Sequence, residues 1–172
     1  MSITRRSGAG RKSGRHTVTA LSAWRRETWA LTAMATWVLQ AGDAARIPAV
    51  RHQVIAALRC RAALGSDLDS AEIVVAELLT NTFAHTPGPA WVTLSWNGTH
   101  PLLSVADIGP GFGRRPGLLD EMHRLVPKLP DDELSEHGRG LYLVAQLTHD
   151  LVVTPRPAGG CVVSATLRLR HR

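Results

Sequence analysis

The chain has 172 residues, a length suited to one domain with a single core. Its hydrophobic fraction of 44% and charged fraction of 20% are ordinary for globular proteins and exclude a largely disordered or membrane-embedded body. Two cysteines are too few for a disulfide framework or a thiolate zinc site, so we expect a reducing, cytoplasmic compartment.

The net charge of +6 is concentrated at the N-terminus. Seven of the 20 Lys and Arg residues precede residue 28, where Glu27 is the one acidic residue, and the other thirteen balance thirteen acidic residues. A stretch rich in Gly, Ser and Arg buries too little apolar surface to offset the entropy of ordering. We therefore expect a solvated, basic arm over residues 1–28 and one folded domain over residues 29–172. An anionic partner or a targeting role for the arm stays open.

The apolar segment over 29–39 follows basic residues, as the core of a secretory signal does. It has about half the length needed to span a bilayer, and no clear small-residue cleavage site follows it. We interpret this segment as a short helix that leads into a first strand over 36–40.

Two amphipathic helices are predicted next. Apolar residues recur at helical spacing over 44–64. A second helix, capped by Asp69 or Ser70, is predicted to end near Ala84, before Pro87-Gly88-Pro89.

Beyond the second helix the apolar period changes to two. Alternation over 91–96, the turn Asn97-Gly98 and an apolar run over 102–106 predict a β-hairpin. Residues 109–137 are rich in Gly, Pro and charge and too long for an ordinary connection, which is typical of a functional lid or of disorder.

A short helix over 140–147 and a second hairpin, over 151–153 and 162–169, complete the predicted elements. Because consecutive strands are joined by short turns, this order predicts an α+β fold and not a doubly wound one. We expect a two-layer α/β sandwich, in which helices cover one face of a mixed, mostly antiparallel sheet.

The second predicted helix carries the first of three motifs. Glu77, Asn81 and His85 are spaced four apart and fall on one narrow helix face. An amide oxygen such as that of Asn81 suits Mg²⁺, which takes oxygen ligands and retains waters and substrate phosphates. Glu77, one turn away, is placed to deprotonate a water or hydroxyl aimed at a terminal phosphate. The alternative is an ordinary solvated helix face.

The second motif follows the first predicted hairpin. A carboxylate at a strand end, such as Asp107, can accept a hydrogen bond from an exocyclic amino group and so select adenine over guanine. Gly109 and Gly111 flank Pro110 and allow the backbone to turn sharply and approach a ligand closely. The alternative is a common D-x-G turn.

The third motif, Gly138-Arg139-Gly140-Leu141, opens the third predicted helix. Free amides and the positive end of the helix dipole can hold phosphate oxygens there, and Arg139 adds a charge. A simple hinge between loop and helix is the alternative.

In this order and at these separations, the motifs resemble those of the GHKL ATPase superfamily of gyrase, MutL, histidine kinases and heat-shock chaperones. E-L-L-T-N at 77–81 resembles the N box, D-I-G-P-G at 107–111 the G1 box, and H-G-R-G-L-Y-L-V at 137–144 the G2 box. The resemblance spans roughly residues 36–170. The short body, which lacks a dimerisation and phosphoacceptor helix pair, is most similar to the small bacterial serine/threonine kinases that act as anti-sigma factors.

The resemblance implies the Bergerat, or histidine kinase-like ATPase, fold, with ATP and Mg²⁺ as cofactors. It implies that Glu77 is the catalytic base, that Asn81 is the Mg²⁺ ligand and that Asp107 reads adenine. Four glycines become hinges of an ATP lid: Gly109, Gly111, Gly138 and Gly140. The remaining nucleotide-binding positions are His85, Arg139, Leu141 and Cys161.

Two positions depart from the family pattern. Ala84 stands where relatives often have a Lys or Arg that can touch phosphate. Cys161 stands where relatives have a Thr whose hydroxyl supports the adenine carboxylate. Because a thiol is a weak hydrogen-bonding group, we expect weaker adenine binding than usual. Neither change touches Glu77 or Asn81, so phosphoryl transfer stays open.

These motifs lead us to expect an anti-sigma factor kinase that binds a sigma factor and phosphorylates an antagonist protein, with homodimerisation as in relatives and no membrane partner. The alternative is a non-catalytic module in which ATP orders the lid and gates a protein partner. Nucleic-acid binding through the arm is disfavoured, because no aromatic residue precedes Trp24 and the body is neutral. His52 lacks the acidic neighbour and partner helix of a histidine-kinase phosphoacceptor.

Overall fold

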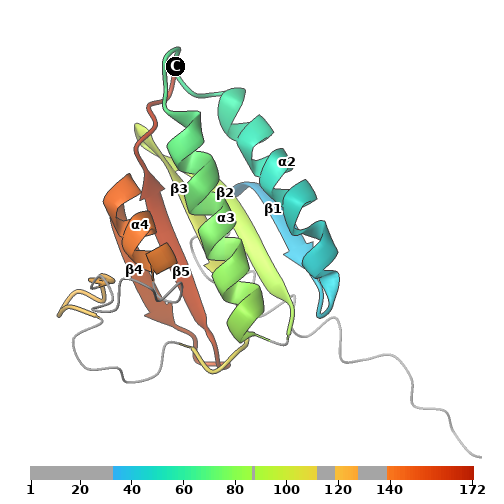
Figure 1. Cartoon of the computed structure of the whole chain (residues 1–172). Coiled ribbons are helices and arrows are strands. Elements are labelled where there is room, and N and C mark those ends of the chain that lie inside the picture. Colours follow the sequence, from blue (N-terminus) through green and yellow to red (C-terminus); the bar gives the residue numbers. More distant parts are fainter. Residues whose placement is uncertain (1–32, 87, 112–118, 128–138) are drawn as a thin grey trace, which may run out of the picture. The chain divides into compact units, whose positions relative to one another are not determined.

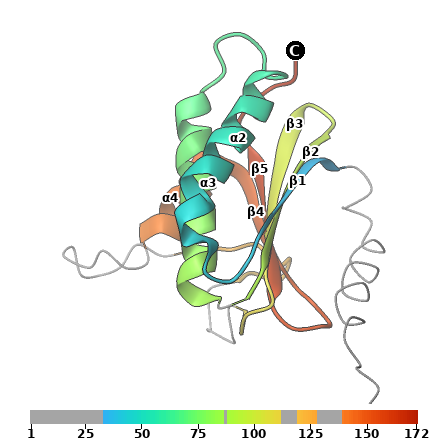
Figure 2. The same cartoon turned by 90° about the vertical axis from the view of Figure 1, so that its right-hand side faces the viewer.

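The computed structural model describes residues 33–86, 88–111, 119–127 and 139–172. They form two layers, a five-stranded sheet and a set of helices on one of its faces (Figure 1; Figure 2). The predicted basic arm and most of the predicted lid lie outside the described residues.

The sheet has the strand order β1-β2-β3-β5-β4, and all four neighbouring pairs are antiparallel. The predicted two-layer sandwich is confirmed. The sheet was predicted to be mixed and mostly antiparallel, and its described strands are antiparallel throughout. The reason lies in the connection after the first strand, where two antiparallel helices return the chain to the end at which it left the sheet. The strands are β1 (Ala33–Leu39), β2 (Ala90–Asn97), β3 (His100–Ala106), β4 (Thr148–Pro155) and β5 (Cys161–Leu167).

The first helix, α2 (Ile47–Arg59), is shorter than predicted. A 3-10 turn, η2 (Asp43–Arg46), precedes it. Beyond the helix, Ala62 forms a β-bridge with His171 near the C-terminus, so the chain leaves helical geometry before residue 64. Helical periodicity alone could not reveal this competing tertiary pairing.

The central helix is α3 (Leu68–His85). Its cap is Asp67, not the predicted Asp69 or Ser70: the Asp67 carboxylate accepts the Ser70 N–H at 3.0 Å and the Ser70 hydroxyl at 2.6 Å. Asp67 wins because only from this position does a carboxylate reach an unpaired amide of the first turn.

The core lies between the two layers. Apolar side chains of α2 and α3 meet the alternate residues of the strands that point toward the helices, and α4 (Arg139–Leu147) adds Val144. The largest of these side chains are fully buried, among them Leu58, Leu79, Val92, Leu94, Leu103 and Val105. Among the described residues, no helix is long and apolar enough to cross a bilayer.

The helix α3 runs the length of the sheet and defines its two ends (Figure 1). The end of β3, the β4–β5 turn and the last turn of α3 lie at one end. The α2–α3 loop, the β2–β3 turn and the C-terminus lie at the other. The predicted site residues map to the first of these ends and to the half of α3 that leads to it.

Candidate functional site

Glu77 and Asn81 lie one turn apart on a half-buried face of α3, opposite the first turn of α4. A Cβ built on Gly140 would collide with the Glu77 carboxylate and would lie 3.5 Å from Asn81 Nδ2. Glycine at position 140 therefore leaves the space that the Glu77 carboxylate occupies against α4. The structure brings the N-box and G2-box residues together, whereas a hinge role for Gly140 stays a prediction.

The side-chain amide of Asn81 has a buried nitrogen with no hydrogen-bond partner. Such a group costs about 1–3 kcal/mol and is expected where a ligand completes the site. A half-turn of the amide exchanges its oxygen and nitrogen, so it can offer an oxygen to a hard cation. No group of three His, Cys, Asp or Glu side chains suited to a metal occurs among the described residues. The Asn81 amide fits Mg²⁺ whose other ligands are phosphate and water oxygens.

The Asp107 carboxylate is buried and held from two sides. The side chain and backbone together are only 6% exposed. Its Oδ1 accepts the Gly109 N–H at 2.7 Å, and its Oδ2 accepts the Cys161 thiol at 3.4 Å. Burial, and then the adjacent Asp107 carboxylate, raise the pKa of the Cys161 thiol to about 12. The thiol therefore stays protonated near neutral pH and acts as the donor.

Arg156, in the β4–β5 turn, holds the main chain at the same place. Its Nη1 donates to the Asp107 carbonyl oxygen at 2.9 Å, and its guanidinium carbon lies 5.4 Å from the centre of the Trp91 ring. The main-chain N–H of Arg156 donates to the main-chain oxygen of Gly160 at 3.1 Å. The turn and the strand end are thus fastened together around Asp107.

Gly160 stands against the Asp107 main chain. Its φ is +79°, and an added Cβ would collide with the Asp107 carbonyl and lie 2.7 Å from Ile108 Cα. A side chain at this position would push the turn away from the strand end. Glycine at position 160, the second of the pair that precedes Cys161, is therefore required for this close approach.

Thr86, the buried residue just after α3, lies between the α3 residues of the site and the loop that follows Asp107. A Cβ on Gly109 would lie 2.5 Å from Thr86 Oγ1, and one on Gly88 would lie 2.6 Å from Ile108. The chain leaving α3 thus packs on the loop that follows Asp107. Asn81 on α3 and Asp107 thus both lie toward the end of the sandwich at which α3 ends.

The other predicted residues have different surroundings. His85 is exposed on the last turn of α3, and Arg139 is exposed at the start of α4. Leu141 is half-buried and packs against the core. Gly111 lies beside the β4–β5 turn, where an added Cβ would be 3.7 Å from the Gly160 oxygen. Gly138 lies outside the described residues.

Thr86, Arg156 and Gly160 were not predicted as site residues. Each acts through a contact with a residue distant in sequence, and no local period or motif marked Thr86 or Arg156. The Gly-Gly pair before Cys161 was a signal that could have been extended to Gly160.

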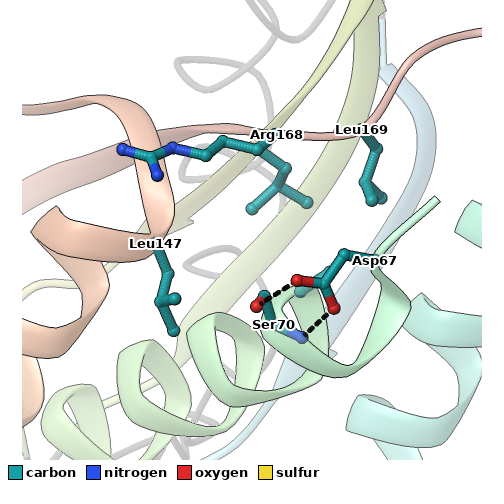
Figure 3. Close-up of a pocket in the computed structure, with 7 residues that line it drawn as sticks. Asp67, Ser70, Leu147, Arg168 and Leu169 are labelled. Carbon is teal, nitrogen blue, oxygen red and sulfur yellow. Dashed lines mark hydrogen bonds between the residues drawn. The ribbon is translucent and has the colours of Figure 1, made fainter.

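A pocket of about 100 Å³ lies at the other end of α3, away from these residues (Figure 3). It is lined by Asp67, Ser70, Ala71, Leu147, Leu167, Arg168 and Leu169. None of the predicted site residues contributes to it, so it is a separate feature of the domain.

Comparison with known proteins identifies the family of the chain. Residues 41–166 match the family described as the histidine kinase-like ATPase domain. No curated protein matches the chain. Among solved structures, the mycobacterial sensor histidine kinase MprB is similar, with 17% sequence identity and a TM-score of 0.47 over 80% of this chain and 100% of that chain. Because the family match covers most of the sequence, the chain belongs to the histidine kinase-like ATPase domain family, of the GHKL type.

Proposed function

We propose that the chain is an ATP-binding regulatory protein that acts as an anti-sigma factor serine/threonine kinase. It transfers a phosphoryl group to an antagonist protein in a partner-switching system, with a sigma factor as its other partner. Family membership implies ATP as the ligand, typically with Mg²⁺. The observation that carries the proposal is the unpartnered buried amide of Asn81 beside the Glu77 carboxylate, on the helix that leads to Asp107.

Base recognition falls to Asp107. Each of its carboxylate oxygens accepts one protein donor and retains further acceptor capacity. An adenine amino group can therefore donate to a carboxylate that is already fixed in place. Guanine presents a carbonyl oxygen at the same position and would place two acceptors together.

Phosphoryl transfer falls to the other end of the nucleotide. Asn81 would hold Mg²⁺, which neutralises phosphate charge when bound. Glu77 accepts the proton of the substrate hydroxyl while the hydroxyl oxygen bonds to the γ-phosphorus. The bond from the γ-phosphorus to the bridging oxygen breaks at the same time, which releases ADP. The backbone of Gly140 lies close to the Glu77 carboxylate.

The choice of a serine or threonine acceptor, a homodimer and a cytoplasmic location rest on the resemblance to anti-sigma factor kinases. The sequence around His52 agrees with this choice, because His52 is exposed on α2 and is flanked by Arg51 and Gln53, neither of which is acidic. We therefore do not assign it as a phosphoacceptor.

The test uses the full-length protein, labelled ATP and candidate antagonists from the same genome. The wild type should label one antagonist on Ser or Thr, and Glu77→Gln should bind ATP normally but label nothing. Asp107→Asn should lose ATP binding. Label transfer that survives Glu77→Gln would refute the kinase proposal.

A second candidate function is a non-catalytic module in which ATP gates a protein partner. Two observations favour it: Ala84 is exposed at the end of α3 and brings no cation to the phosphates, and the thiol of Cys161 holds Asp107 only weakly. Calorimetry that shows ATP binding, no turnover with any antagonist, and ATP-dependent affinity for a sigma factor would select this function.

A further inference from the structure

The end of the domain opposite Asp107 carries a group of unpaired arginines. We call this group the arginine end; its members are Arg59, Arg61, Arg168, Arg170 and Arg172. All five are exposed, and within the described part of the chain none has a carboxylate within 4.0 Å. Three other arginines, Arg46, Arg51 and Arg124, each pair with an acid.

Two of these arginines are held in place by main-chain oxygens. Arg168 Nε donates to the Thr148 oxygen at 3.1 Å. Arg172 Nε donates to the Ala62 oxygen at 3.0 Å, and its Nη2 donates to the Arg59 oxygen at 3.4 Å. Guanidinium groups that are fixed in this way lose less entropy when they bind a carboxylate.

Imidazole rings extend the same cluster. His100 Nδ1 donates to the Leu169 oxygen at 2.8 Å, and its ring centre lies 4.4 Å from that of His149. Burial, and then the charges of His100, Arg168 and Arg170, lower the pKa of His149. The groups of this cluster are thus close enough to repel one another, and a bound anion would relieve that repulsion.

Apolar surface accompanies the charge. Leu64, 96% exposed, lies in the α2–α3 loop, whose Ala63 N–H donates to the Arg170 oxygen at 2.8 Å. The 100 Å³ pocket described above joins Leu147, Leu167 and Leu169 to Arg168 (Figure 3). An apolar cavity of about 150 Å³ can hold benzene, so this pocket has room for one aliphatic side chain. Its carboxylate, that of Asp67, is already engaged with Ser70.

We propose that the arginine end, with Leu64 and the adjoining pocket, is a docking surface for an acidic protein segment that carries an exposed aliphatic side chain. Arginine around an apolar anchor is typical of protein interfaces. A nucleic acid would neutralise the arginines but would leave Leu64 and the leucine-lined pocket without a partner. Because the surface lies at the opposite end of α3 from Asp107, this inference does not depend on ATP turnover.

The experiment places the photo-cross-linker p-benzoylphenylalanine at position 64 of the full-length chain in its own host. The protein that cross-links is then purified and titrated against the uncross-linked chain by calorimetry. We expect the double variant Arg61→Glu/Arg170→Glu to bind the partner about tenfold more weakly or worse, because close charge pairs steer and hold acidic partners. The affinity of the wild type should fall at high salt, which screens these charges. Arg46→Glu reverses a charge far from the arginine end and should bind the partner like the wild type.

Several outcomes would overturn the proposal: no cross-linked protein, cross-links only to a second copy or to DNA, or equal affinity of the double variant and the wild type. Leu64→Ser, which retains every charge, should weaken binding on its own. Circular dichroism checks that each variant is folded. Asp107→Asn should leave this affinity unchanged, so failure of the nucleotide site and failure of the docking surface give different results.

Discussion

The guanidinium of Arg156 donates to the main-chain oxygen of Asp107 at 2.9 Å, although the two residues are 49 positions apart. This bond joins the β4–β5 turn to the strand end that carries Asp107, whose carboxylate we propose to read adenine. The same guanidinium lies over the Trp91 ring of β2, so one side chain connects three strands. We infer that Arg156 is a positioning residue, which acts on the nucleotide through Asp107.

Replacement of Arg156 tests this role. Arg156→Met retains the aliphatic length but removes the donor to Asp107, and we expect ATP affinity to fall about tenfold, because hydrogen bonds from charged groups contribute about 1.5–3 kcal/mol. Arg156→Lys should recover part of the affinity. Calorimetry measures the effect, and Arg124→Met, at an exposed ion pair with Asp150, is the control. Unchanged affinity in Arg156→Met would contradict the positioning role.

Substitution of Cys161 tests the weak bond to Asp107. Cys161→Thr supplies a hydroxyl, a stronger donor than the thiol, so ATP affinity should rise by roughly three- to tenfold. Cys161→Val has nearly the shape of the Thr variant but no donor and should lower affinity and stability together. If the Thr and Val variants bind ATP equally, the side chain at 161 does not support the carboxylate.

Titration of the same thiol gives a pH-dependent prediction. Its pKa is raised from 9.0 to about 12, so the stabilisation it provides is complete below pH 9 and is lost as the pH rises toward 12. Relative to Cys161→Val, the wild type should lose about 1 kcal/mol of unfolding free energy between pH 8 and pH 10. Urea titrations at the two pH values measure this difference. A gain in relative stability at pH 10 would contradict the assignment.

Iodoacetamide provides an independent check on that thiol. At pH 8, exposed Cys60 should react while buried, protonated Cys161 stays unmodified. Peptide mass spectrometry distinguishes the two cysteines, and Cys60→Ser serves as the control.

The elements that could be predicted from sequence are those whose pattern is local. The hairpin over 91–106 has alternating residues and an Asn-Gly turn, and it forms as β2 and β3. The spacing of Glu77 and Asn81 is a property of the helix itself. Asp107 was found because it ends a strand. These features require no knowledge of the rest of the molecule.

The features that could not be predicted depend on contacts between distant segments. Arg156 and Thr86 become site residues only because the β4–β5 turn and the end of α3 converge on the loop after Asp107. The early end of α2 likewise follows from the bridge between Ala62 and His171. Periodicity and motifs do not report such tertiary pairings.

A methyl group at residue 140 should separate catalysis from folding. In Gly140→Ala the new Cβ would collide with the Glu77 carboxylate, so phosphoryl transfer should fall about a hundredfold or more, while helix propensity by itself favours Ala by about 1 kcal/mol. Labelled-ATP transfer and urea unfolding measure the two effects. Gln146→Ala, at an exposed position of the same helix, should leave transfer unchanged. Full transfer activity in Gly140→Ala would show that Glu77 needs no fixed position.

The side-chain nitrogen of Asn81, which has no hydrogen-bond partner, is expected to lower the free energy of unfolding of the ligand-free protein. Asn81→Leu removes a buried nitrogen that lacks a partner and should raise the free energy of unfolding of the ligand-free protein by about 1–2 kcal/mol. The same variant should lose the Mg²⁺ dependence of ATP binding, because no side-chain oxygen remains to hold the ion. Urea unfolding without nucleotide and calorimetry with ATP, each with Mg²⁺ or with EDTA, measure the two effects. Thr80→Leu, at an exposed position of the same helix, should give neither. If Asn81→Leu destabilises the ligand-free protein, the amide has a structural partner and is not reserved for an ion.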